Sequence, residues 1–334
     1  MATEKNTSVA IEQLIKGVQK GDTASLARAI TLVESTRQES AQKAETILEE
    51  CRKTTCQSIR IGITGVPGVG KSTFIEALGL LLTTFDKKVA VLAIDPTSSE
   101  TKGSILGDKT RMPELVKNPN AFIRPSPSSE SLGGVSRKTR ESIILCEAAG
   151  YEVILIETVG VGQSETLVHS MVDFFLLLKL PGAGDELQGI KRGIIEMADA
   201  IVINKADGDN LKAARIAQTD FNKALHLYPP KANGWVPKVL SCSALKNEGI
   251  AEVWELIATH YQEGSKSGSL IHRRKEQNKY WLLQTIEDRL KFDFYENNGV
   301  KKMLQTLMTD VSENKISPFV AAQQLLSLYK SESN

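Results

Sequence analysis

The chain has 334 residues, of which 41% are hydrophobic, and its 41 lysines and arginines nearly balance its 40 aspartates and glutamates, for a net charge of +1. This length and composition suit one large α/β domain with helical additions, or two domains, around a sizeable core. The charge balance excludes the global basic field that draws nucleic acids or anionic membranes to a protein, so we expect neither as a partner.

The cysteines and histidines predict no metal centre. The four cysteines form no C-x-x-C pair, and the four histidines are scattered without ligand spacing. The N-terminus lacks both a signal-peptide apolar core and the arginine-rich composition of a transit peptide, so we expect a cytoplasmic protein. The most apolar stretch, Val172–Leu180, is about half as long as a bilayer span and contains Lys179, so a buried strand explains it better.

The hydrophobic pattern predicts three parts along the chain. Residues 1–57 carry apolar positions at helical spacing, interrupted at Gly21, and are expected to form an N-terminal helical extension. Residues 58–264 alternate short β-branched runs with helical segments, which is typical of a doubly wound, mostly parallel sheet. A glycine- and serine-rich stretch at 264–269 is expected to be a flexible joint, after which residues 271–290 and 300–330 are again helical. The C-terminal helical part is expected to span residues 265–334. The predicted strands are 58–64, 89–94, 121–124, 153–157, 174–180, 200–204 and 239–242.

The first motif in chain order is a complete G-x-x-x-x-G-K-S phosphate-binding loop between a predicted strand and a predicted helix. Its glycines let backbone N–H groups curl around phosphates, and the helix directs its positive end at the same anion. Lys71 is placed to reach the β- and γ-phosphates, and the Ser72 hydroxyl suits Mg²⁺. A plain glycine-rich turn is the alternative, and the loop alone does not distinguish ATP from GTP. The predicted binding residues are Gly65, Val66, Pro67, Gly68, Val69, Gly70, Lys71, Ser72 and Thr73.

Two aspartates follow the second predicted strand. Asp95 comes directly after residues 89–94, and Asp108 lies in the loop 103–111. Both are candidates for the first or second coordination shell of a magnesium ion. Helix capping is the competing explanation for an aspartate at a strand end, and for Asp108 both explanations stay open.

The strand 153–157 ends in Glu157, and Gly160 follows three positions later, which resembles the D-x-x-G switch of GTPases with glutamate in place of aspartate. Glu157 could act on Mg²⁺ directly or through a water molecule, and the Gly160 N–H could sense the γ-phosphate. Val161 stands where Ras-type switches carry a water-positioning glutamine. We therefore predict slow intrinsic hydrolysis.

The strand 174–180 leads into a charged loop, residues 181–193, that contains four glycines. This composition suits a segment with two conformations, although an inert surface loop has the same composition.

The segment N-K-A-D at 204–207 follows a predicted strand and matches the guanine-specificity element of GTPases. The Asp207 carboxylate can accept hydrogen bonds from guanine N1–H and the exocyclic amine, which adenine does not offer in that geometry. Asn204 is expected to brace the loop, and Lys205 to cover the base. A plain strand-end turn is the alternative, but the position downstream of a phosphate loop favours GTP and GDP as ligands. A second guanine-contacting segment, whose backbone N–H would meet guanine O6, comprises Ser243, Ala244 and Leu245.

Taken together, these segments resemble the MeaB/ArgK family of GTPases, the bacterial relatives of the human methylmalonic aciduria type A protein. The resemblance covers nearly the whole chain and implies a P-loop NTPase G domain with N- and C-terminal helical extensions. Nickel-type metallochaperone GTPases generally carry His/Cys clusters that are absent from this sequence. The segments that carry the resemblance are GVPGVGKST, AIDPTSSETKGSILGDKTRM, RPSPSSESLGGVSRKT, ETVGVGQSE, LPGAGDELQGIK and VINKADGDN.

The resemblance implies a homodimeric chaperone of an adenosylcobalamin-dependent acyl-CoA mutase, usually methylmalonyl-CoA mutase. In such a protein, GTP binding and hydrolysis gate cofactor loading and protect the mutase. Mutase binding is implied to bring Lys191, in a third switch with Gln188, near the phosphates and to raise the GTPase rate. Residues 265–334 are implied to be a dimerisation arm. The implied magnesium residues are Ser72, Asp95, Asp108 and Glu157, and the implied catalytic residues are Lys71, Asp95, Asp108, Glu157, Gln188 and Lys191.

Two other functions stay open. The family has also been described as a kinase or transport ATPase that acts on a protein acceptor, against which N-K-A-D argues. A regulatory GTPase without a cobalamin link would carry the same nucleotide motifs. The sequence has no D-x-H-x-x-G cobalamin-binding pattern, so we expect the cofactor to stay on the partner. Methylmalonyl-, isobutyryl- and ethylmalonyl-type mutases are not distinguished by these residues.

Overall fold

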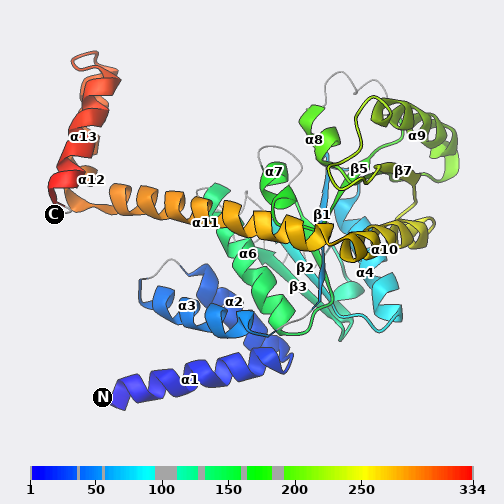
Figure 1. Ribbon diagram of the computed structural model, residues 1–334, viewed down its shortest axis with the longest axis horizontal. Helices are drawn as coiled ribbons and strands as arrows, with labels where there is room; N and C mark the ends of the chain where they lie inside the picture. Colours follow the sequence, from blue (N-terminus) through cyan, green and yellow to red (C-terminus); the bar gives the residue numbers. More distant parts are fainter. Residues whose placement is uncertain are drawn as a thin grey trace. The chain divides into compact units, whose positions relative to one another are not determined.

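The computed structural model describes residues 2–35, 38–54, 57–94, 111–126, 132–158, 164–182 and 192–332. Within them, a seven-stranded sheet in the order β3-β2-β4-β1-β5-β6-β7 forms the centre of the fold (Figure 1). Each neighbouring pair of strands is parallel, which confirms the predicted doubly wound α/β class. The strands are β1 (Ile59–Gly65), β2 (Val89–Ile94), β3 (Ala121–Ser126), β4 (Val153–Glu157), β5 (Phe174–Lys179), β6 (Ala200–Ile203) and β7 (Lys238–Ser241).

The strands are apolar because helices cover both faces of the sheet (Figure 1). Alternate residues of β1 point to opposite faces. Ile61 and Ile63 join the cluster formed with α4 (Lys71–Thr84) and α10 (Ile250–Ser267). Gly62 faces the other side, where an added Cβ would lie 2.8 Å from Val168 Cγ1 on α7 (Ser164–His169). Among the described residues, the other helices of this domain are α6 (Leu132–Ala148), α8 (Arg192–Met197), α9 (Leu211–Leu225) and the short η2 (Leu115–Lys117) and η4 (Gly208–Asn210).

The strand order reverses around β1. The chain runs outward from β1 to β2 and β3, returns to β4, and continues on the other side of β1 through β5, β6 and β7. Open α/β sheets bind ligands in the crevice at the carboxyl ends of the strands beside such a reversal. The phosphate-loop motif follows β1 and therefore lies at this crevice.

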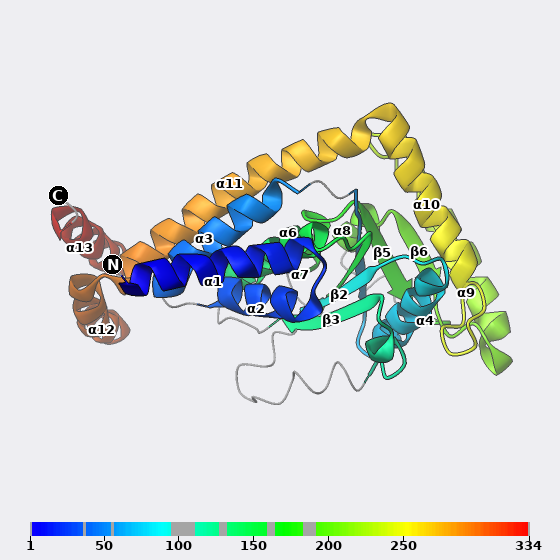
Figure 2. The same cartoon turned by 90° about the horizontal axis from the view of Figure 1, so that it is seen from below.

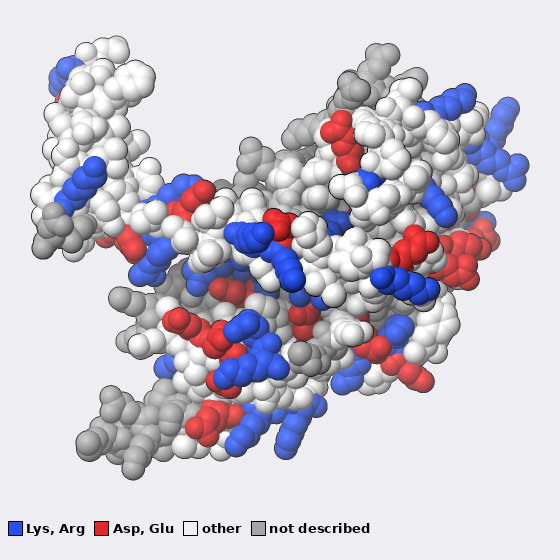
Figure 3. All heavy atoms as spheres, in the orientation of Figure 1, with Lys and Arg blue, Asp and Glu red and all other residues white. Residues whose placement is uncertain are grey.

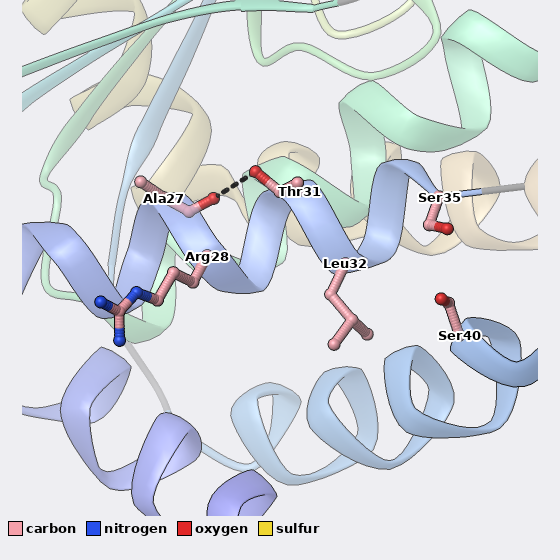
Figure 4. A pocket seen from close by; sticks show the side chains of 6 residues that line it. All are labelled: Ala27, Arg28, Thr31, Leu32, Ser35 and Ser40. Atoms are coloured by element: carbon pink, nitrogen blue, oxygen red, sulfur yellow. Dashed lines mark hydrogen bonds between the residues drawn. The ribbon is translucent and has the colours of Figure 1, made fainter. Parts of the chain in front are cut away.

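The N-terminal extension consists of α1 (Ala2–Gln19), α2 (Thr23–Glu34) and α3 (Gln38–Arg52). The predicted interruption is present: Gly21 has a φ of +78°, and Asp22 caps α2 by accepting a hydrogen bond from Ser25 N at 2.8 Å. Both α2 and α3 contact α6, beside which they lie in Figure 2. A shallow pocket between α2 and α3 is shown in Figure 4, and its lining residues are Ala27, Arg28, Thr31, Leu32, Ser35 and Ser40.

The segment predicted as a flexible joint is helical instead, and that prediction was wrong. Helix α10 continues to Ser267, Gly268 ends it with a φ of +75°, and α11 (Ser269–Glu296) begins at the next residue. The start of α11 is fixed to the sheet, because Arg274 donates to both Asp173 oxygens, at 2.8 and 2.6 Å, and to Ser58 O at 2.7 Å. One left-handed glycine thus separates two ordered helices.

The chain divides into two compact units, residues 1–277 and 278–334. In the second unit, α12 (Asn298–Ser312) and α13 (Pro318–Glu332) pack as a hairpin around Val300, Leu307, Ala321 and Leu325. Asn297 caps α12 by accepting a hydrogen bond from Val300 N at 2.9 Å.

The surface carries both signs of charge. On the face shown in Figure 3, basic and acidic side chains are interspersed over the described residues, in line with the near-neutral total. Within the ranges given above, no helix is both long and apolar enough to cross a membrane.

Candidate functional site

The phosphate-loop motif forms a tight connection from β1 to α4 at the carboxyl edge of the sheet. Two glycines in it are required by their surroundings. A Cβ on Gly65 would lie 2.7 Å from Leu178 O, and a Cβ on Gly70, whose φ is +92°, would lie 2.8 Å from Asn204 Nδ2. Gly70 also precedes the first turn of α4, so the N–H groups of that turn face the crevice. The connection therefore has the backbone shape that phosphate binding requires.

Lys71 lies in the first turn of α4 with its ammonium folded back over the loop. Its Nζ donates to Gly65 O at 3.0 Å and to Val66 O at 3.4 Å, and the side chain is buried. Burial lowers the pKa of Lys71, while the negative charge of Glu157 acts in the opposite direction. A phosphate oxygen is a stronger partner for an ammonium than these two carbonyls, so the arrangement is ready to exchange them for a bound phosphate.

Ser72 and Glu157 meet across the crevice. Ser72 Oγ donates to Glu157 Oε1 at 3.3 Å, which brings the start of α4 to the end of β4. The end of β4 is fixed in turn, because Thr158 Oγ1 donates to Thr64 Oγ1 at 2.8 Å. A hydroxyl and a carboxylate oxygen side by side are the donor chemistry that Mg²⁺ prefers, so these two residues fit a magnesium ion. Groups of three or more histidine, cysteine or acidic side chains suited to a metal are absent from the described ranges.

Asn204 joins three segments at the other end of the crevice. It is buried, its Nδ2 donates to Val69 O at 2.9 Å, and its Oδ1 accepts from Ala244 N at 3.1 Å. The neighbouring Lys205 has a φ of +59° and donates from Nζ to Gly68 O at 2.8 Å. The N-K-A-D segment is thus tied directly to the phosphate loop.

Asp207 is oriented by the segment that follows β7. The fully buried Ser243 donates from its hydroxyl to Asp207 Oδ2 and accepts a hydrogen bond from Lys246 N at 3.2 Å. The backbone of Ser243 pairs with Glu248 in both directions and closes the turn. The side chain of Leu245 is 80% exposed. A half-buried carboxylate held in one orientation is suited to accepting hydrogen bonds from two adjacent donors on a base.

Two charged residues near Lys71 were not identified from the sequence. Their charges act on the pKa of Lys71 in opposite directions. Arg111 lowers this pKa, and Glu165, in the first turn of α7, raises it. Both effects are smaller than that of burial. Glu165 is only 4% exposed. Its place in the motif E-T-V-G-V-G-Q-S-E was visible in the sequence, but its burial was not.

Several predicted site residues lie outside the described ranges. They are Asp95, Asp108, Gly160, Gln188 and Lys191.

Comparison with known proteins gives concordant results. A family model described as "Methylmalonyl Co-A mutase-associated GTPase MeaB" matches residues 26–299. The Escherichia coli protein "GTPase ArgK" is 46% identical over 94% of this chain and 95% of its own length. The mouse "Methylmalonic aciduria type A homolog, mitochondrial" is 44% identical over 96% of this chain and 80% of its own. A crystal structure of a "LAO/AO transport system kinase" superposes with a TM-score of 0.75 at 38% identity, covering 96% of this chain and 98% of that one.

Proposed function

We propose that this chain, which belongs to the family of methylmalonyl-CoA mutase-associated GTPases, is a GTP-dependent chaperone of an adenosylcobalamin-dependent acyl-CoA mutase. The predicted family and the predicted GTPase activity are confirmed by the family match and by relatives that are named GTPases. Methylmalonyl-CoA mutase is the first candidate partner, because the family description names it. In this proposal, GTP binding and hydrolysis gate cofactor loading and protect the mutase from inactivation.

The observation that carries the guanine assignment is the orientation of Asp207 by Ser243. We propose that Asp207 binds guanine N1–H and the exocyclic amine. The N–H of Ala244 donates to Asn204, and the N–H of Lys246 donates to Ser243. The N–H of Leu245 lies between these two in the chain, and we assign it to guanine O6.

At the phosphate end, we propose that the loop N–H groups and Lys71 bind the β- and γ-phosphates. Ser72 and Glu157 would hold Mg²⁺, with Asp95 and Asp108 as further groups of its shell. The ion would neutralise charge on the phosphate oxygens when bound. Lys71 contributes positive charge from the protein itself, where negative charge accumulates during transfer of the γ-phosphoryl group to water.

The remaining parts of the proposal follow the family resemblance. Lys191, with Gln188, would approach the phosphates when the mutase binds and thereby raise the hydrolysis rate. The C-terminal helices would form the arm of a homodimer. Large apolar side chains exposed on α12 and α13 support this assignment, including Met308 at 63% and Phe319 at 86% exposure. We place the protein in the cytoplasm.

The rival function is ATP-dependent phosphorylation or transport, which the description of the superposed kinase structure suggests for that protein. The decisive experiment measures phosphate release from GTP and from ATP, each with and without purified methylmalonyl-CoA mutase. GTP-selective release that increases with mutase supports the proposal. GTP-selective release that mutase leaves unchanged would contradict the assignment of this partner, and preference for ATP would contradict the guanine site.

A further inference from the structure

Glu165 is a buried carboxylate that the motifs above leave without a role. It is 4% exposed, and its side chain makes no hydrogen bond to any described residue. Removing a carboxylate from water costs several kcal/mol unless partners compensate. Lys71 compensates part of this cost, because the charge of Glu165 acts on it, and a polar ligand bound beside the nucleotide can compensate the rest.

The packing of α7 on β1 determines where Glu165 lies. Val168 covers Gly62 in the middle of β1. Residues three apart share one face of a helix, so Glu165 lies on the same face as Val168, about one turn closer to the start of α7. The chain enters α7 from the end of β4, which is the carboxyl edge of the sheet, and leaves it towards the start of β5. Glu165 is therefore at the edge that carries the phosphate loop.

The charges around Lys71 support this placement. Glu157 and Glu165 both favour its charged form, although burial has the larger effect and lowers its pKa. Glu157 is already engaged with Ser72, at the position suited to a magnesium ion. Glu165 is thus a second carboxylate whose charge acts on the Lys71 ammonium, and it has no hydrogen bond comparable to that between Glu157 and Ser72.

We propose that Glu165 is a positioning residue for GTP hydrolysis, whose carboxylate accepts a hydrogen bond from the attacking water. In this step the water oxygen bonds to the γ-phosphorus, and the bond from that phosphorus to the β–γ bridging oxygen breaks. GDP leaves, and the proton of the water ends on the released phosphate. Ras-type GTPases orient this water with a glutamine for which this chain has Val161. The inference concerns the GTPase reaction, so it does not depend on which mutase is the partner.

The test is single-turnover GTP hydrolysis with protein in excess, comparing wild type with Glu165→Gln and Glu165→Ala. Glutamine keeps the shape and an acceptor oxygen but removes the charge, so we expect hydrolysis about 10-fold slower. Alanine removes the acceptor oxygen, and we expect the rate of hydrolysis to fall roughly 100-fold. Affinity for a fluorescent GTP analogue should stay within about 3-fold in both, because the interaction forms with the water and not with the nucleotide. The matched control is Glu196→Ala, an exposed glutamate on α8, which should hydrolyse at the wild-type rate.

Three results would overturn the proposal. Hydrolysis by Glu165→Gln at the wild-type rate removes Glu165 from the reaction. An unchanged rate at saturation with weaker GTP binding, or with a higher Mg²⁺ requirement, assigns it to ligand or metal binding instead. A loss of rate in Glu165→Gln that matches a loss of folded protein, measured by thermal denaturation, assigns it to structure. Since glutamine fits the same space, this variant decides the question even where the alanine variant does not fold.

Discussion

Replacing Asn204 by alanine tests whether one side chain holds the two ends of the nucleotide site together. The change removes the amide that donates to Val69 O and accepts from Ala244 N, which belong to segments far apart in the sequence. Asn204 is buried, so little water can replace the amide. Each buried group left without a partner costs about 1–3 kcal/mol, and two such groups give an expected total of about 2–6 kcal/mol.

This free energy divides between folding and binding. The Val69 carbonyl is in the phosphate loop, and the Ala244 N–H is in the segment that we assign to guanine, so both lose their fixed position. We expect GDP affinity to fall at least about 30-fold, which corresponds to about 2 kcal/mol, and the rest of the loss to lower the stability of the nucleotide-free protein.

The assay is titration with a fluorescent GDP analogue, combined with chemical denaturation of the nucleotide-free protein. The control is Asn210→Ala, because Asn210 precedes α9 and its exposed side chain makes no capping bond. If Asn204→Ala retains both affinity and stability within the error of the control, the claim that Asn204 couples the two loops is refuted.

Three further predictions concern other parts of the chain. Asp207→Asn should weaken GTP binding and favour xanthosine nucleotides, because the amide can donate to a 2-oxo base; competition between GTP and XTP measures this, and unchanged GTP affinity would exclude Asp207 from the base site. Lys191→Ala should leave GTP affinity nearly intact but abolish most stimulation by mutase, and equal stimulation of wild type and variant would argue against the third switch. Burial lowers the pKa of His169 from 6.5 to about 4, so the unfolded chain binds more protons between these values. As far as His169 is concerned, the free energy of unfolding should be highest above about pH 6.5 and should fall as the pH decreases towards 4. The fall should be smaller in His169→Gln, and equal pH dependence of denaturation in both proteins would contradict this assignment.

The fold class and the nucleotide motifs could be predicted because their signals are local. The phosphate loop is contiguous, and its glycines, lysine and serine act through the backbone geometry of one strand-to-helix connection. The strands are short apolar runs between helical segments, and all of those predicted appear near their predicted positions. The joint at 264–269 was predicted wrongly, because its composition suits a linker while Gly268 in fact caps a helix.

The sequence by itself therefore indicated the strands, the phosphate loop and the expected choice of guanine, since each of these signals lies in a short stretch of the chain. Only the tertiary structure brought Ser72 to Glu157 and Asn204 to Val69, and only it buried Glu165 beside the loop. The physical reason is that burial, hydrogen-bond partners and pKa shifts depend on what packs around a side chain. The residues that pack around these side chains come from segments that are distant in the sequence. The order of the strands in the sheet decides which of these segments lie next to one another.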